Sequence, residues 1–383
     1  MHIHQADGDK AYLHGELDEE LYMRIPEGIN DLALAGKVLK LDRALYGRKQ
    51  AGPSGTTAST RRWGASALYV DDLLFVSPSL DEITRIKTGL KEEYGIKDLG
   101  EARFILGNQI HRCAYSGVFL SQRAYLEDVL LRLGQAGCRT APTPMIPLSQ
   151  LHAVPEDHTP SPLFRCRYLQ AVGSPMYVML GTCLTLPTPS ASSGGTRTAW
   201  TTRTIEYVPD DTPLVGFKAY SNLAWGACVD TVRSTMGYAF VLASGAVSWL
   251  SKLQPRVTAS STEAEYLSLS HASKEAVFLR QLLDEFGHNA PGPATLLGDN
   301  QDANALSREA QFHDCTRHLR LTEHFVLEQV EQGVIAVTYI PTAHMVADAM
   351  TKSLPAPAFV GHRAALGVKP LRARGGVAAE PQT

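Results

Sequence analysis

Two adjacent carboxylates, Asp71 and Asp72, stand between two short apolar runs, Ala67-Leu-Tyr-Val70 and Leu73-Leu-Phe-Val76. Adjacent carboxylates without a basic partner repel each other, so a fold accepts them most readily in solvent or around a divalent cation. Apolar runs on both sides of a polar pair are typical of a β-hairpin. The pattern therefore predicts a hairpin that carries either a solvated turn or part of a cation site.

A third carboxylate, Asp7, follows a β-like start of the chain and precedes Ala11-Tyr-Leu13. Three carboxylates that meet can hold two Mg²⁺ ions about 4 Å apart. Such a pair of ions aligns an attacking hydroxyl with a triphosphate and stabilises both the entering and the leaving oxygen. Asp7, Asp71 and Asp72 are therefore candidate ligands for two Mg²⁺ ions.

The neighbouring segments predict the elements that hold these carboxylates. A helix is expected after the hairpin, because Ser79 and Glu82 form a capping box and apolar residues then share one face. A second hairpin is expected from Phe104–Ile110 and Val118–Leu120, which flank a Gly-containing turn. The first third of the chain thus alternates strands and helices.

The C-terminal region predicts a second set of elements. Strands are expected at Val215–Tyr220, Trp225–Asp230, Gly237–Ala243, Ala246–Leu250, Thr295–Leu297 and Val334–Ile340. A long helix is expected from Thr262 to Phe286, where apolar residues recur three and four apart. Shorter helices are expected after Asn300, near Thr316–Gln332 and from Met345. Antiparallel strands followed by alternating helices and strands indicate an α+β domain with a mixed sheet.

The composition supports folded cores. The chain has 383 residues, 44% of them hydrophobic, and its length predicts two domains with connecting material. Collagen, a simple coiled coil and a short disulfide scaffold are excluded. The formal net charge of −3 argues against a polybasic partner surface, although it leaves local basic channels open.

The six cysteines lie far apart with no C-x-x-C pair, which predicts reduced thiols and a cytoplasmic or nuclear protein. No signal peptide is expected, and no run approaches the roughly 18 apolar residues of a membrane span. A polar run near residue 318 contains residues that could ligate zinc, but a helix would spread them around its circumference, so zinc binding is not predicted there. That run contains His313, Cys315, His318 and His324.

An ordered set of motifs resembles the Pol polyprotein of copia-type LTR retrotransposons. Tyr69-Val-Asp-Asp72, followed by Leu-Leu-Phe-Val76, is similar to the catalytic hairpin of reverse transcriptases. The other matching runs are Lys10–Gly28, Ala44–Ala51, Lys97–Gly107, Arg233–Tyr238, Ser261–Tyr266, Asp299–Gln301 and Ala347–Lys352. A lone YVDD motif is common, whereas this ordered set is specific, and the similar blocks cover roughly residues 5–50, 67–185 and 214–355.

The resemblance implies an α+β protein: a partial reverse transcriptase palm followed by a ribonuclease H-like domain with a mixed five-stranded sheet and flanking helices. The implied parts are a palm and thumb over 1–135, a connection over 136–213, a ribonuclease H-like domain over 214–355, and a disordered tail over 356–383. Two acid-free stretches depart from the family and favour disorder or turns, one at 51–67 and one at 186–205.

By the same resemblance, Asp7, Asp71 and Asp72 form the metal-binding triad of a polymerase that copies a template–primer. Tyr12 matches the aromatic beneath the sugar of the incoming nucleotide, where a ring excludes a 2′-hydroxyl; the alternative is an ordinary strand aromatic. Gln50 matches a nucleotide-contacting position. Only six residues precede Asp7, so the strands and basic fingers that grip template and triphosphate are expected to be missing, and processive synthesis is not expected.

The resemblance also implies a second centre, which hydrolyses the RNA strand of an RNA/DNA hybrid with two Mg²⁺ ions. Position 222, Glu265, Asp299 and Asp348 match its four carboxylates. Each has a plainer alternative, because Glu265 could be a solvated helix residue and the two aspartates could be helix or strand caps.

Position 222 is Asn222, where the family reads Tyr-Ser-Asp-Ala-Asp-Trp, and Ala224 replaces the second acid. An asparagine offers a carbonyl oxygen but removes a full negative charge from a site that holds two dications. Ribonuclease H activity is therefore expected to be absent or very weak. The rival hypothesis is a non-catalytic nucleic-acid-binding or interaction module that retains the ribonuclease H fold.

Overall fold

The structure, a computed structural model, forms two compact units, Met1–Ile105 and Leu106–Thr383. Unit 1 and unit 2 denote these below, and each is described by itself. The described residues are 1–8, 20–24, 38–41, 66–69, 71–112, 117–135, 143–144, 159–182, 203–208, 216–288, 291–308 and 321–370. In this part of the chain, no helix is both long and apolar enough to cross a bilayer.

Unit 1 is built on a four-stranded antiparallel sheet in the order β4-β5-β1-β6. Its strands are β1 (His2–Asp7), β4 (Ser66–Tyr69), β5 (Asp72–Ser77) and β6 (Lys97–Glu101). β4 and β5 form the predicted hairpin, with Tyr69 opposite Asp72. The unit also contains a two-stranded ribbon, β2 (Leu21–Arg24) with β3 (Val38–Leu41), and the short strand β7 (Phe104–Ile105).

Helix α2 (Leu80–Tyr94) follows the hairpin as predicted. Ser79 caps it by accepting a hydrogen bond from the Glu82 backbone N–H at 3.3 Å, and Gly95 ends it in the left-handed region at φ 69°. Its buried apolar face packs on the sheet. The core of unit 1 comprises Ala6, Phe75, Ile83, Ile86, Leu90 and Ile96.

Unit 2 contains the predicted mixed five-stranded sheet, in the order β13-β12-β11-β14-β15. Its strands are β11 (Lys218–Ala224), β12 (Thr235–Leu242), β13 (Gly245–Leu253), β14 (Ala294–Gly298) and β15 (Ile335–Tyr339). The first three pair antiparallel, and β11, β14 and β15 run parallel. Parallel strands need crossover connections, which the helices between them supply.

The strand expected at Trp225–Asp230 is wrong. These residues form turns between β11 and β12, closed by hydrogen bonds from the backbone N–H of Val232 to the Cys228 carbonyl and of Cys228 to the Arg233 carbonyl. Gly226 and Val232 both have positive φ, 57° and 53°, which extended backbone does not allow. The apolar residues of 225–230 therefore lie in turns and not in a strand.

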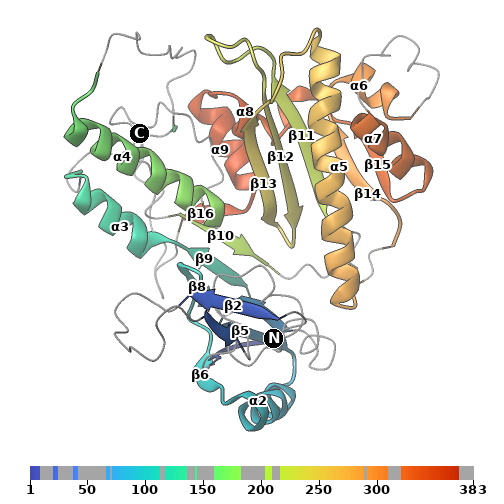
Figure 1. The fold of residues 1–383 in the computed structure, drawn as a ribbon. Helices are drawn as coiled ribbons and strands as arrows, with labels where there is room; N and C mark the ends of the chain where they lie inside the picture. The colour runs from blue at the N-terminus through green and yellow to red at the C-terminus, as the bar shows by residue number, and fades with distance from the viewer. Residues whose placement is uncertain are drawn as a thin grey trace. The chain divides into compact units, whose positions relative to one another are not determined.

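Three helices cover one face of this sheet: α5 (Ser261–Glu285), α6 (Gln301–Leu306) and α7 (Leu321–Glu331) (Figure 1). They were predicted at nearly these positions. Their apolar side chains meet those of the sheet in one core cluster, which includes Phe240, Tyr266, Leu296, Ala303 and Val326.

The opposite face carries α8 (Asp348–Thr351) and α9 (Ala356–Ala365) around a second core cluster. The disordered tail expected from residue 356 is therefore wrong up to residue 370. Phe359, Leu366 and Val368 are buried in this cluster, and β16 (Val368–Pro370) pairs with another strand. Residues beyond 370 lie outside the described part.

A second antiparallel sheet of unit 2 joins β16, β10 (Arg203–Tyr207), β9 (Val118–Ser121) and β8 (Asn108–Arg112) in that order. β8 and β9 are the predicted second hairpin. Residues 203–205, expected to be disordered, belong to β10, because Thr204 and Ile205 are buried between two partner strands. The other residues of 186–205, and residues 51–65, lie outside the described ranges.

Helices α3 (Arg123–Arg132) and α4 (Pro162–Gly181) complete unit 2. The buried Gln122 side chain ties the two together, since its Oε1 accepts from the backbone N–H and the hydroxyl of Thr182 at 3.0 and 2.9 Å. The indole N–H of Trp249 donates to the Met179 carbonyl at 2.8 Å, which anchors the end of α4 to β13.

Candidate functional site

The palm carboxylates, Asp7, Asp71 and Asp72, lie at one edge of the unit 1 sheet. Asp7 ends β1 and stands opposite Asp72, the first residue of β5. Directly opposite residues on antiparallel strands have Cα atoms about 4.5–5.5 Å apart and side chains on the same face. The Gly8 backbone N–H donates to the Asp71 carbonyl at 2.7 Å, which brings the turn against the end of β1.

These carboxylates are partly open to solvent: Asp7 is exposed, and Asp71 and Asp72 are half-buried. Asp72 Oδ1 accepts a hydrogen bond from the Gln5 side-chain amide at 2.9 Å. The structure thus brings the three residues to one place, and their role in metal binding stays a prediction. Tyr12 and Gln50 lie outside the described residues.

The ribonuclease H-like centre, defined here as Asn222, Glu265, Asp299 and Asp348, is assembled from four elements of unit 2. Asn222 lies on β11, Glu265 on the second turn of α5, Asp299 directly after β14, and Asp348 at the start of α8. Ser221 points to α5, where its hydroxyl lies 3.2 Å from that of Ser268.

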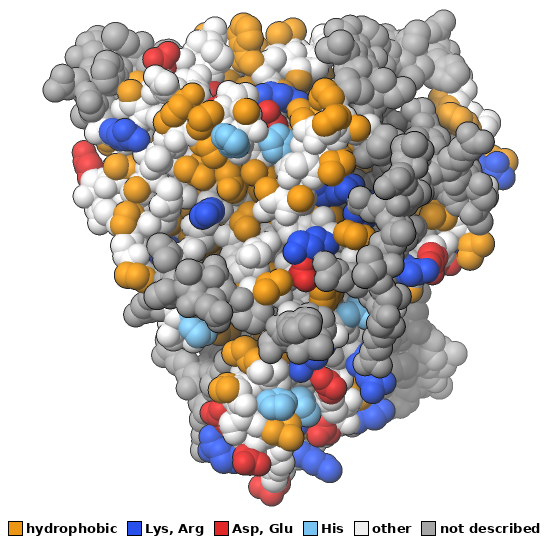
Figure 2. Space-filling view, turned by 180° about the vertical axis from the view of Figure 1, so that it is seen from behind, with side chains coloured by type: hydrophobic (Ala, Val, Ile, Leu, Met, Phe, Trp, Pro, Cys, Tyr) orange, Lys and Arg blue, Asp and Glu red, His pale blue; other side chains and the backbone are white. Residues whose placement is uncertain are grey.

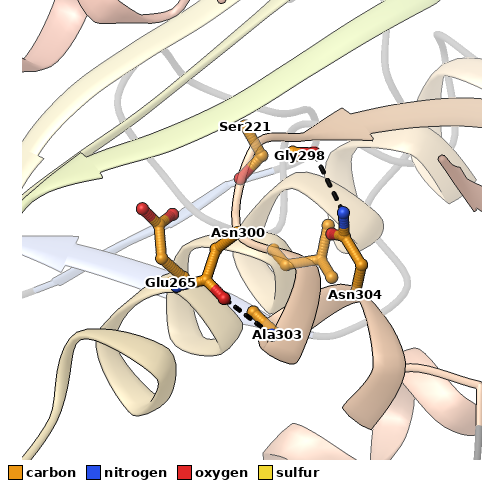
Figure 3. Close-up of a pocket in the computed structure, with 7 residues that line it drawn as sticks. Ser221, Glu265, Gly298, Asn300, Ala303 and Asn304 are labelled. Carbon is orange, nitrogen blue, oxygen red and sulfur yellow. Dashed lines mark hydrogen bonds between the residues drawn. The ribbon is translucent and has the colours of Figure 1, made fainter. Parts of the chain in front are cut away.

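A small pocket adjoins Glu265, as Figure 3 shows. Asn300 caps α6 by accepting from the Ala303 backbone N–H at 3.0 Å, and the Asn304 amide donates to the Gly298 carbonyl at 2.9 Å. These bonds fix the turn that follows β14, and with it the position of Asp299. The lining residues are Ser221, Glu265, Leu269, Gly298, Asn300, Ala303 and Asn304.

Gly237 lets α8 approach the sheet closely. This glycine is the β12 partner of Asn222, and a Cβ atom on it would lie 2.7 Å from Met350 Cβ and 2.8 Å from Thr351 Cγ2. Any side chain at position 237 would therefore push α8 outward. Its absence allows Asp348 to reach Asn222.

Asp348 is 6% exposed, and two donors converge on its Oδ1. One is the side-chain amide of Asn222, and the other is the ammonium of Lys352 at 2.8 Å. Asn222 is 1% exposed, and its own Oδ1 accepts from the Leu223 backbone N–H at 2.6 Å. Both polar atoms of the Asn222 amide are therefore engaged within the protein.

Burial, together with the negative charges of Asp299 and Asp348, raises the pKa of Glu265 to about 8, and the positive charge of Lys352 acts against this shift. Burial disfavours an ionised carboxylate, and nearby carboxylates add repulsion. The Glu265 side chain is consequently protonated in most molecules at neutral pH when no cation is bound.

The ribonuclease H-like centre does not fit two Mg²⁺ ions. One of its four positions is a neutral amide, and two protein donors already occupy Oδ1 of Asp348. Within the described ranges, no three His, Cys, Asp or Glu side chains are grouped closely enough to hold one metal ion. The palm carboxylates supply the oxygen donors that Mg²⁺ prefers, but they too form no group of three close enough to hold one ion in this structure. His313, Cys315 and His318 lie outside the described residues.

The sequence analysis gave Lys352 no role beyond its place in a matching motif, and the structure shows it in contact with Asp348. It lies four residues after Asp348, the spacing at which oppositely charged side chains pair on a helix. That spacing was a usable signal, but the burial of Asp348 was not apparent from the sequence. On the face seen in Figure 2, basic side chains of the described residues are interspersed with acidic and apolar ones and form no continuous stripe.

The sequence family described as reverse transcriptase (RNA-dependent DNA polymerase) matches residues 1–62 and 64–147. Over 398 residues the chain is 30% identical to the retrovirus-related Pol polyprotein from transposon TNT 1-94 of Nicotiana tabacum, covering 93% of this chain and 30% of that protein. It is 29% identical over 414 residues to that from transposon RE1 of Arabidopsis thaliana, covering 96% and 27%. The chain therefore spans less than a third of these relatives.

Among solved structures, a foamy viral protease-reverse transcriptase in complex with RNA/DNA hybrid shares 12% identity at a TM-score of 0.45, covering 89% of this chain and 44% of that one. RNase H1 from Halobacterium salinarum shares 19% identity at a TM-score of 0.22, covering 35% and 92%. The ordered motifs and the sequence matches to plant transposons agree, and the chain belongs to the Pol polyprotein family of copia-type retrotransposons.

Proposed function

We propose that this chain serves as a reverse transcriptase and ribonuclease H section of a retrotransposon Pol protein, and that its ribonuclease H-like centre does not hydrolyse RNA. Asn222 carries the second part of the proposal. An amide there removes one full charge from a centre whose chemistry needs carboxylates, and it donates a hydrogen bond to Asp348 instead of repelling it.

A hydrolysis assay tests the proposal. The full chain is incubated with a labelled RNA/DNA hybrid and Mg²⁺, and no turnover above background is expected. Asn222→Asp restores the missing charge, and it is expected to raise hydrolysis at least about 100-fold, as single electrostatic groups in active sites commonly do. Asn108→Asp, the same change on β8, serves as the matched control and is expected to stay inactive.

Turnover by the unaltered chain that disappears in Glu265→Gln would show that Asn222 supports hydrolysis and would overturn the proposal. If Asn222→Asp also failed to hydrolyse the hybrid, the unaltered centre would still be inactive, and the amide at position 222 would not be its sole defect.

For the palm carboxylates we propose weak, non-processive DNA synthesis on a template–primer. Asp7, Asp71 and Asp72 would hold Mg²⁺, which when bound supplies charge stabilisation for the transferred phosphate. Their position at one sheet edge supports this, while the departure from the family at 51–67 argues for a weakened substrate grip. Primer extension on an RNA template is expected to be slight and to vanish in Asp71→Asn.

The second candidate function is nucleic-acid binding without turnover, and the intact mixed sheet beside Asn222 favours it. Filter binding to hybrid, duplex and single strands at several salt concentrations tests for this binding function. A binder that contacts several phosphates loses affinity steeply as salt rises, whereas a protein without such contacts shows little salt dependence.

A further inference from the structure

Lys87 of helix α2 is buried against β1 and β6, and each N–H bond of its ammonium has an acceptor. The side chain is 7% exposed. Its Nζ donates to Oδ1 of Asp98 on β6, and it lies 3.3 Å from Nδ1 of His4 and 3.4 Å from the Gln5 carbonyl oxygen, both on β1. An ammonium carries three donors and no acceptor. The hydrogen bonds of Lys87 therefore join three elements of unit 1.

This arrangement fixes the protonation state of His4. Because Lys87 can only donate, Nδ1 of His4 has to offer its lone pair, so the ring is neutral and carries its proton on Nε2. Protonation of Nδ1 would remove this hydrogen bond and place two positive charges side by side. The ammonium cannot turn away freely, because the Gln5 carbonyl and the ring of Phe75, at 5.8 Å, enclose it as well.

We propose that the contact between His4 and Lys87 is a pH-sensitive fastening, which holds α2 to β1 at neutral pH and loosens it when His4 takes up a proton in mildly acidic solution. The fastening lies apart from the palm carboxylates, because side chains alternate along a strand and His4 is therefore on the face of β1 opposite to that of Asp7. The apolar core beneath α2 does not titrate, so the helix is expected to loosen and not to detach.

The surroundings of His4 favour its neutral form. Burial and the positive charge of Lys87 lower the pKa of His4 from its ordinary value of 6.5, and His2 on the same strand acts in the same direction. Asp98 and Glu101 of β6 act against this shift without cancelling it. From β5, an uncharged phenyl ring lies opposite His4.

The lowered pKa sets the sign of the pH dependence. When α2 opens, His4 is free to bind a proton as pH falls below about 6.5, whereas the closed state resists that proton. The free energy of opening therefore decreases as pH falls from about 7, and it levels off only below the lowered pKa of His4.

Hydrogen exchange of the full chain between pH 5 and pH 7.5, corrected for the intrinsic rate at each pH, tests the proposal. In the unaltered chain, protection of the α2 amides is expected to fall at least about threefold from the upper to the lower pH. His4→Asn places a carbonyl oxygen near the position of Nδ1 and cannot be protonated, so it is expected to remove this pH dependence. His2→Asn, the same change on the same face of β1, is the control and is expected to retain it.

An NMR titration of the imidazole nitrogens of the unaltered chain guards against a His4→Asn variant that fails to fold. The His4 ring is expected to be mostly neutral at pH 6.5, with its proton on Nε2, and to become charged only at lower pH. Protection of α2 that stays constant from pH 7.5 to pH 5 would overturn the proposal. So would an equal pH dependence in the unaltered chain and in His4→Asn, or a His4 ring that is already mostly protonated at pH 6.5.

Discussion

The palm carboxylates and the ribonuclease H-like centre handle negative charge in opposite ways. In unit 1, Asp7 and Asp72 face each other at an open sheet edge, and Asp7 is exposed to water. In unit 2, Asp348 is buried and accepts hydrogen bonds from the side-chain amide of Asn222 and the ammonium of Lys352. Water can solvate exposed carboxylates, whereas buried ones need donors built into the fold. The carboxylates of unit 1 are therefore stabilised largely by solvent, whereas Asp348 of unit 2 is paired with groups of the protein.

The largest expected effect concerns the close approach that builds the second centre. Gly237→Ala is expected to destabilise unit 2 by about 3 kcal/mol, because the new Cβ meets Met350, Thr351 and the Leu250 carbonyl. Chemical denaturation measures the loss. Gly173→Ala in α4, where nothing lies within 4 Å, is the matched control and is expected to be neutral or slightly stabilising. Equal stability of both variants would mean that α8 does not press on the sheet.

The next effect is a pH dependence specific to the centre. The pKa of Glu265 is raised to about 8, so the folded state binds a proton that the unfolded state releases above its ordinary value of 4.5. Stability therefore falls as pH rises from about 5 to about 8 and then levels off. Glu265→Gln is expected to remove this slope and to gain about 2 kcal/mol over the unaltered chain at pH 8. An unchanged slope would show that the side chain is solvated.

In unit 1, stability is expected to depend on pH in the opposite direction. The pKa of Asp98 is lowered: burial acts against this shift, but the hydrogen bond from Lys87 and further contacts outweigh it. Its contribution is therefore lost as pH falls through the lowered value. Asp98→Asn is expected to cost only about 1 kcal/mol, because Asp98 is half exposed and Lys87 keeps contacts with His4 and the Gln5 carbonyl. Hydrogen exchange resolved by unit, measured at pH 4 and pH 7, checks both signs.

The smallest effect concerns the turn beside Asn222. Val232 is 60% exposed and has a positive φ of 53°, a conformation that is strained for a β-branched residue. Val232→Gly is expected to stabilise unit 2 by at most about 1 kcal/mol, because relief of strain is partly offset by the entropy of glycine. Val229→Gly in the same turn is the comparison and is expected to be destabilising. A loss of stability in Val232→Gly would mean that the valine side chain has a packing role.

Long periodic patterns made the best predictions from sequence. α5 was expected within a residue of its bounds, because apolar residues recur three and four apart along most of its length. Asn300 marks the start of α6, where its side chain caps the helix. The strand at Trp225–Asp230 was wrong because a short apolar stretch carries little information, and positive φ angles at Gly226 and Val232 place these residues in turns. α9 was not predicted, because its alanines and glycine resemble those of a linker. In the folded structure, Phe359 of this helix and the adjacent Leu366 are buried in a core cluster.

The centre was only partly predictable for a related reason. The motifs identified Asn222, Glu265, Asp299 and Asp348, and the structure places all four on the elements expected for them. The contact of Lys352 with the buried Asp348 depends on the close approach of α8 to the sheet, which Gly237, 111 residues earlier in the chain, allows. Such a relation is three-dimensional, and no local spacing encodes it.

The pairing of β10 with β16 has a consequence for how this protein folds during synthesis. Thr204 and Lys369 meet across a sequence separation of 165 residues, and Val368 closes the core beneath α9. Contacts between such distant residues are slow to form. A ribosome must have released residue 370 before β10 can acquire its second neighbour. Nascent chains that stall earlier are therefore expected to expose an unpaired strand edge and to depend on chaperones.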